Sequence, residues 1–145
     1  MPIFAQSSKE IEGVYDFVSQ EITITKSGNI TKTPAEKHIL ASPRWTGLWQ
    51  INNGYFSSFL MKAERDTSSS CEKRLSEFEA FAGTYGVDGD EITFKQNYSL
   101  DPFFKGRPVI MSYKIENNIL TLSKHIYPTI EDMKEGTMII TLKRR

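Results

Sequence analysis

Apolar and polar residues alternate with a period of two along most of this chain, which is the pattern of β-strands with one buried face. Residues 14–25 are rich in β-branched and aromatic side chains and contain neither glycine nor proline, so they predict a long, bent strand. Residues 29–43 are ambiguous because Pro34 and Pro43 interrupt them, and only residues 37–40 indicate a short strand.

Hairpin turns separate the strands that follow. Asn-Gly and Asp-Gly steps tolerate the positive φ angles of tight turns, and an Asn-Asn step marks a third turn. The turns lie at residues 52–54, 88–90 and 117–118, and they join strands predicted at 45–51 and 55–62, at 84–87 and 91–98, and at 107–115 and 119–124, before a last strand at 137–143. The pattern predicts eight strands, plus one or two weaker ones within residues 29–41.

One segment has the period of a helix. Ser69 and Glu72 have the spacing of a capping box, and Gly83 is a typical residue at a helix C-terminus. The apolar stripe between them consists of Leu75, Phe78, Phe81 and Ala82. We therefore expect one helix over residues 71–82.

Eight or more antiparallel strands in one domain of 145 residues form either a sandwich or a closed barrel. Their hairpin-by-hairpin order favours an up-and-down arrangement over a Greek key, which needs long connections. The expected fold class is all-β, an eight- to ten-stranded antiparallel up-and-down barrel over residues 13–145, with one helix near residues 71–82 and an N-terminal extension at residues 1–12. The interior of such a barrel accommodates either packed side chains or one small ligand.

Composition and motifs exclude several classes of function for this chain. The 18 basic and 18 acidic residues balance, so the chain has no basic footprint for nucleic acid or a membrane surface. The single cysteine, Cys71, excludes an intrachain disulfide and a cysteine-based zinc site. The sequence shows no signal peptide, membrane-spanning apolar run, phosphate-binding loop or recognisable catalytic set. We expect a cytoplasmic monomer or homodimer without a cofactor or bound metal.

Four sequence blocks resemble a known pattern. Residues 44–61 resemble the run G-x-L-I-Y-T-x-D-G-Y-M-S, and residues 81–90 resemble Y-x-G-T-Y-x-V-D-G-D. Residues 99–106 are similar to S-L-x-P-x-W-x-G, and residues 142–145 are similar to L-x-W-x-R. These blocks are typical of the lipocalin-like domain family of bacteria and fungi, and the resemblance covers residues 13–145. It implies a small calycin-type β-barrel.

The N-terminal block departs from this family, whose chains usually begin with Gly-x-Trp. Here Gly13 is followed by Val14 and Tyr15. The resemblance implies that Tyr15 takes the place of the bulky aromatic residue at the base of the barrel, stacked under Arg144 or Arg145.

Candidate ligand-binding residues are inward-facing aromatic and polar side chains. A tyrosine hydroxyl or an arginine in an apolar barrel orients a ligand oxygen strongly, because water does not compete there. The candidates are Tyr113, Tyr98, Tyr85, Trp49, Met111, Arg107 and Phe56. Each tyrosine is also compatible with an ordinary sheet position, and Arg107 with a solvated loop.

Three functions remain open on this sequence. The first is a binding module that holds a small hydrophobic or amphiphilic molecule. The second is a calycin-type isomerase, cyclase or hydratase that uses acid–base residues in the barrel, which rests on fold analogy. The third is an interaction domain whose interior is filled by large side chains such as Phe56, Leu60, Met111 and Met138. An interior cavity with convergent polar groups favours the first two.

Overall fold

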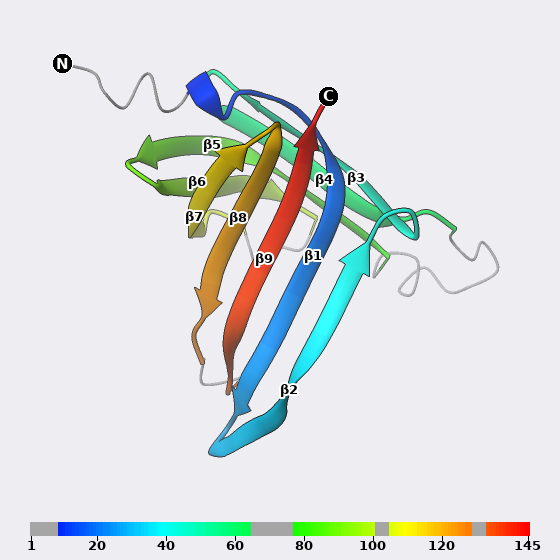
Figure 1. The fold of residues 1–145 in the computed structure, drawn as a ribbon. Helices are drawn as coiled ribbons and strands as arrows, with labels where there is room; N and C mark the ends of the chain where they lie inside the picture. The colour runs from blue at the N-terminus through cyan, green and yellow to red at the C-terminus, as the bar shows by residue number, and fades with distance from the viewer. Residues whose placement is uncertain (1–8, 65–76, 101–104, 129–132) are drawn as a thin grey trace.

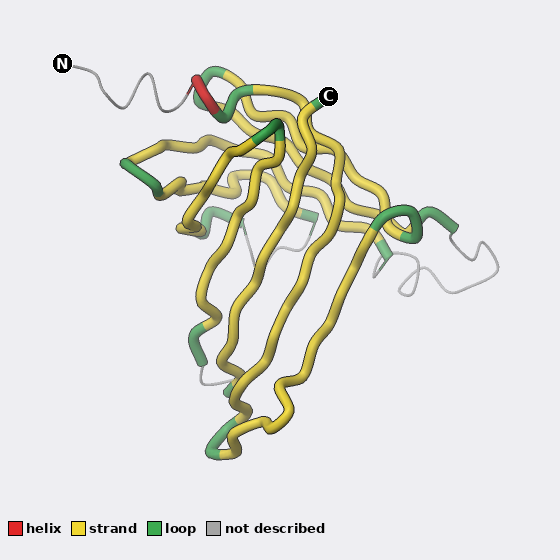
Figure 2. The backbone as a smooth tube through the Cα atoms, viewed as in Figure 1, coloured by secondary structure: helices red, strands yellow, loops and turns green. Residues whose placement is uncertain are grey.

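The computed structural model describes residues 9–64, 77–100, 105–128 and 133–145. Nearly all of this part of the chain is strand and connecting turn, as Figure 2 shows. The strands are β1 (Gly13–Ser27), β2 (Ile30–Ala41), β3 (Trp45–Asn52), β4 (Tyr55–Lys62), β5 (Phe78–Asp88), β6 (Glu91–Ser99), β7 (Pro108–Glu116), β8 (Ile119–Ile126) and β9 (Lys134–Arg144).

The sheet closes on itself because β1 pairs with neighbours on both edges (Figure 1). One edge of β1 pairs with β9 from Tyr15 to Ser27. On the other edge, residues 13–16 pair with β3 and residues 19–27 pair with β2. Strands β1 and β3–β9 therefore form a closed antiparallel barrel of eight strands with up-and-down order, and β2 is an additional strand beside it. This confirms the predicted fold class.

Four strands extend beyond the rest of the barrel. Figure 1 shows β8, β9, β1 and β2 side by side, reaching past the ends of the other strands. Residues directly opposite each other in an antiparallel pair share a face of the sheet. The register therefore places Lys124, Met138, Ile22 and His38 in one row across this four-stranded extension, on the face that continues the barrel interior.

Two local expectations need correction. The predicted helix over residues 71–82 is wrong in its C-terminal half, because Phe78–Ala82 lie in β5 and pair with β4. Its first half, with Cys71, lies outside the described residues. The segment expected to be a short strand at residues 37–40 is a strand of twelve residues. Within the part of the chain that the structure describes, no helix is long and apolar enough to cross a membrane.

β-Bulges change which face of a strand points inward. In β1 the register shifts between Phe17 and Ser19, so that Val18 is an extra residue. Tyr15 and Phe17 face inward before this bulge, and even-numbered residues such as Gln20 face inward after it. The imperfect alternation of residues 14–25 in the sequence therefore reflects a bulge rather than a loss of amphipathic character.

The core occupies the inside of the barrel. Its fully buried or nearly buried side chains come from the residues before β1 and from every barrel strand except β5. They are Ile11, Tyr15, Phe17, Ile51, Phe56, Leu60, Ile92, Phe94, Met111, Leu120, Leu122, Ile140 and Leu142. Burial of each large apolar side chain contributes about 1.5–3 kcal/mol, so this cluster supplies much of the driving force for closure.

Tyr15 and Arg144 close one end of the barrel. Tyr15 is fully buried, and its hydroxyl donates to the carbonyl oxygen of Ile11 at 2.7 Å. The Arg144 guanidinium lies over the ring, with Cζ 5.3 Å from the centroid, and donates to the Tyr15 hydroxyl at 2.8 Å. A further hydrogen bond runs from Arg144 to the carbonyl oxygen of Glu10. The expected stacking of Tyr15 under a C-terminal arginine is confirmed for Arg144.

Candidate functional site

A cavity of about 440 Å³ lies inside the barrel. Inward-facing side chains provide nearly all of its lining, from β1, from β3–β7 and from the extension strands β8 and β9. The lining residues are Phe17, Gln20, Ile22, Trp49, Phe56, Ser58, Phe59, Leu60, Glu79, Phe81, Phe94, Gln96, Val109, Met111, Lys124, Ile126, Met138 and Ile140. A volume between about 300 and 1,000 Å³ with a mostly apolar lining is typical of small-molecule sites.

Two other hollows lie on the outside of the barrel. One of about 670 Å³ is lined mainly by turn residues and outward-facing side chains, including Glu12, Gln50 and Tyr55. The other, of about 500 Å³, follows the outer surface of β3–β6. Although the first is larger than the interior cavity, neither encloses a ligand, so the interior cavity is the better candidate site.

An aromatic cluster forms part of the cavity lining. The rings of Phe56 and Phe94 meet edge to face with centroids 4.8 Å apart. Trp49 contacts both, with centroids 5.7 Å from Phe94 and 6.4 Å from Phe56. Contacts of this geometry hold the rings in fixed positions and contribute about 0.5–1.5 kcal/mol per pair beyond burial. The cluster therefore presents a rigid apolar surface to the cavity.

A few polar side chains interrupt the apolar lining. Ser58 is only 7% exposed and lies between Phe56 and Leu60 on the inner face of β4. The Oε1 atom of Gln96 is buried and has no hydrogen-bond partner among the described residues. A buried acceptor without a partner is unfavourable by about 1–3 kcal/mol, so a ligand or water molecule that donates to Gln96 is favoured. The remaining polar lining residues are Gln20, Glu79 and Lys124.

Three of the seven predicted site residues line the cavity: Trp49, Phe56 and Met111. Tyr85 and Tyr113 pack against the core beside the cavity without being part of its lining. The Tyr113 hydroxyl donates to the carbonyl oxygen of Gly89 at 3.1 Å. Burial raises the pKa of the Tyr85 hydroxyl above 10.0, the ordinary value for tyrosine. These two tyrosines therefore pack behind the cavity lining and do not face the cavity.

The inward orientation expected of Tyr98 is wrong. Its side chain is 73% exposed on the outside of β6. Simple alternation from Phe94 through Gln96 places Tyr98 inward, but the register shifts so that Ala82 pairs with Tyr98 and Gly83 with Gln96. The extra residue in β6 turns Tyr98 to the outer face.

Arg107 also lies away from the cavity. It is exposed in the segment that leads into β7, and it already interacts with another part of the protein. The structure therefore separates Arg107 and Tyr98 from the other candidate residues.

Sequence reasoning missed all five polar lining residues, which are Gln20, Ser58, Glu79, Gln96 and Lys124. Lys124 has a recognisable signal, because it follows Leu120 and Leu122 at a spacing of two, and a charged residue on an apolar strand face marks either a strand end or a site. Gln96 has the same relation to Ile92 and Phe94. Ser58 contributes to the cavity because its side chain is small beside Phe56 and Leu60. The sequence alone does not show that this space stays empty.

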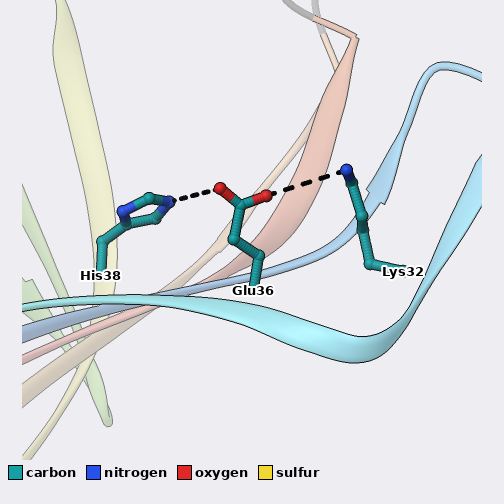
Figure 3. A network of polar contacts seen from close by, with 3 residues as sticks. All are labelled: Lys32, Glu36 and His38. Carbon is teal, nitrogen blue, oxygen red and sulfur yellow. Dashed lines mark hydrogen bonds and ion pairs between the residues drawn. The ribbon is translucent and has the colours of Figure 1, made fainter.

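The two histidines contact carboxylates at the protein surface. His38 lies on β2 with Nε2 3.0 Å from Oε1 of Glu36, whose other oxygen is 3.9 Å from Nζ of Lys32 (Figure 3). His125 contacts Glu135 at 3.1 Å. All of these side chains are well exposed, and such pairs contribute little to stability. In the four described segments, no group of three acidic, histidine or cysteine side chains is arranged to hold a metal ion.

No protein-family model matches this chain, and no curated protein matches it.

Proposed function

We propose that this protein binds a small hydrophobic or amphiphilic molecule in the interior cavity of the barrel. The observation that supports this is the cavity itself, about 440 Å³ in volume, with a mainly apolar lining and a small number of polar side chains. Apolar lining favours transfer of a hydrocarbon group from water, and isolated polar groups orient the rest of the ligand.

Ligand binding is favoured over the role of an interaction domain with a filled interior, because the large inward side chains line a cavity and do not fill it. Phe56, Leu60, Met111 and Met138 all belong to the cavity lining. Protein interiors are normally packed without voids larger than a water molecule, so a cavity of this size lined by rigid rings is unusual for a purely structural core. A bound ligand restores the dispersion contacts that these side chains lack.

Binding is also favoured over acid–base catalysis. Burial raises the pKa of the Tyr15 and Tyr85 hydroxyls above 10.0. Neither residue lines the cavity. A general acid or base works best with a pKa near the working pH, and these two hydroxyls are displaced away from it.

We also propose that the chain is a member of the lipocalin-like domain family. Support comes from the four sequence blocks in family order and from the base of the barrel. There, Gly13-Val14-Tyr15 occupies the start of the first barrel strand and Arg144 packs over the Tyr15 ring.

Substitution of two adjacent serines tests binding in the cavity. Ser58→Leu fills the cavity with a larger apolar side chain, while Ser57→Leu places the same side chain on the exposed outer face of β4. Decanol serves as the probe, and quenching or enhancement of tryptophan fluorescence serves as the signal because Trp49 lines the cavity. We expect saturable binding by the unaltered protein, at least about ten-fold weaker binding by Ser58→Leu, and unchanged binding by Ser57→Leu. Equal loss in both variants, or no saturable binding at all, contradicts the proposal.

A further inference from the structure

Lys124 is a cation on the inner face of the barrel wall. Its neighbours at a spacing of two along β8, Leu122 and Ile126, are both inward-facing, and Met138 lies directly opposite on β9. The side chain is only partly exposed, and it lines the cavity together with these apolar neighbours except Leu122, which is buried in the core. The ammonium group of Lys124 therefore lies next to the apolar side chains of the cavity lining.

The barrel wall opens beside Lys124. Strand β8 pairs with β7 over Ile119–Ser123, and this ladder ends one residue before Lys124. From there on, β8 belongs to the four-stranded extension that reaches past the other barrel strands (Figure 1). Lys124 therefore lies at the rim of the cavity, where a charged group of a ligand remains in contact with water while its apolar part is buried.

The ionisable side chains that line the cavity differ in whether the protein itself provides them with a partner. The lining contains two ionisable side chains, Glu79 on β5 and Lys124 on β8. Glu79 already interacts with another residue of the protein. Within the described ranges, no carboxylate lies within ion-pair distance of Lys124, whereas Lys62 and Lys114 pair with Glu77 and Glu116 at 3.7 and 3.2 Å. An ammonium group that is partly removed from water gains most from an anionic partner.

We infer that the ligand of this cavity is an amphiphile with a carboxylate head group, which Lys124 binds at the rim while the hydrocarbon tail packs against Trp49, Phe56 and Phe94. This inference rests on the proposed function. It specifies the charge of the ligand and the orientation in which it enters, head group toward the extension and tail toward the aromatic cluster.

A carboxylate fits this rim better than a phosphate. Phosphate recognition in proteins typically uses several donors, often an arginine that binds in bidentate fashion or a row of backbone amides. Among the described residues, no arginine lines the cavity, and Lys124 supplies a single compact charge. One ammonium group balances one carboxylate.

The experiment compares four probes with the same decyl chain: decanol, decanoate, decylammonium and decyl phosphate. The full-length protein is titrated with each at neutral pH by calorimetry. Three proteins are used: the unaltered chain, Lys124→Met, and Lys95→Met as the matched control, since Lys95 is exposed on the outer face of β6, next to the lining residue Gln96. Circular dichroism and thermal unfolding verify that both variants fold.

We expect the unaltered protein to bind decanoate about ten-fold more tightly than decanol, which is the effect of one charge-assisted hydrogen bond at a partly exposed site. Lys124→Met removes this preference and leaves decanol binding within about two-fold, whereas Lys95→Met changes neither. Equal binding of decanol and decanoate by the unaltered protein overturns the inference while the proposed function stands. Tighter binding of decylammonium or of decyl phosphate overturns it as well, and the former assigns the head group to Glu79. Binding of none of the four overturns both proposals.

Discussion

Tyr15 and Arg144, separated by 129 positions in the sequence, meet at the closed end of the barrel with Nη2 of Arg144 2.8 Å from the Tyr15 hydroxyl. The pair joins the first and last barrel strands, since Tyr15 and Arg144 are also opposite each other in the β1–β9 ladder. Arg144 additionally binds the backbone of Glu10, just before the fully buried Ile11. One guanidinium therefore holds together the barrel seam and the segment that plugs its base.

Arg144→Met tests this role in stability. The variant loses the contact with the Tyr15 ring and two hydrogen bonds from the guanidinium, so we expect the free energy of unfolding to fall by about 2–3 kcal/mol. Urea unfolding at neutral pH measures the change. Arg145→Met is the matched control because Arg145 is 63% exposed and pairs only at the surface with Asp16, and it should change stability by less than about 1 kcal/mol. Equal effects of the two variants contradict a special role for Arg144.

Tyr15→Phe has a pH-dependent effect on stability. Burial raises the pKa of the Tyr15 hydroxyl above 10.0, although the hydrogen bond from Arg144 and its charge act in the opposite direction. A group whose folded pKa is raised stabilises the fold fully below its unfolded pKa, and this contribution is lost as the pH rises through the folded pKa. At neutral pH we expect Tyr15→Phe to be less stable than the unaltered protein by about 1–2 kcal/mol, because the hydrogen bond to Ile11 is lost.

The difference between the two proteins should then shrink as the pH rises above about 10, because only the unaltered protein has the hydroxyl that ionises on unfolding. Urea unfolding in a series of buffers from neutral to strongly alkaline pH measures this. A difference that stays constant or widens over the alkaline range would falsify the assignment of a raised pKa to Tyr15.

We expect substitution by alanine to have opposite effects on stability at two glycines of β5, Gly83 and Gly86. A Cβ at Gly83 overlaps the backbone carbonyl oxygen of Lys95 at the β6 bulge, whereas a Cβ at Gly86 meets no atom within 4 Å. Gly83→Ala forces the two backbones apart, and we expect a loss of about 3 kcal/mol or more in the free energy of unfolding. Gly86→Ala reduces the freedom of the unfolded chain and should be neutral or stabilising by up to about 1 kcal/mol. Thermal or urea unfolding of both variants distinguishes them, and similar losses would show that the close approach at Gly83 is unimportant.

The bulge beside Gly83 also explains a limit of sequence-based prediction. Hairpin turns and alternation are local, so they predicted strands and an up-and-down barrel correctly. The face of Tyr98 depends on one extra residue in β6, and that bulge depends on the close approach of the Lys95 carbonyl to a glycine in another strand. Neither is visible in the sequence of β6 alone. The aromatic candidates Trp49 and Phe56 lie on β3 and β4, away from this bulge, and both line the cavity as the alternation of their strands suggests.

The error at residues 78–82 has a different cause. Phe78, Phe81 and Ala82 have helical spacing, but the same residues pair with β4 as a strand, with Phe81 in the cavity lining and Phe78 stacked on Phe59 at 6.5 Å outside. Apolar residues on both faces satisfy either period, and tertiary pairing decides between them. Strand β2 was predicted only in part, as a short strand at residues 37–40, for a related reason: it buries too little apolar surface to show an alternating pattern over its full length.

Gln96→Met tests the polar lining independently of any ligand. The unpartnered Oε1 atom of Gln96 is buried beside the cavity, and a methionine of similar length replaces it with an apolar group. Because removal of an unsatisfied buried acceptor relieves a desolvation penalty, we expect the free protein to gain about 1 kcal/mol in unfolding free energy. Gln50→Met is the control on the exposed outer face of β3 and should lie within about 0.5 kcal/mol of the unaltered protein. A destabilised Gln96→Met variant would show instead that Gln96 is satisfied in solution, for example by a bound water molecule, and that its amide belongs to the structural wall and not to the ligand site.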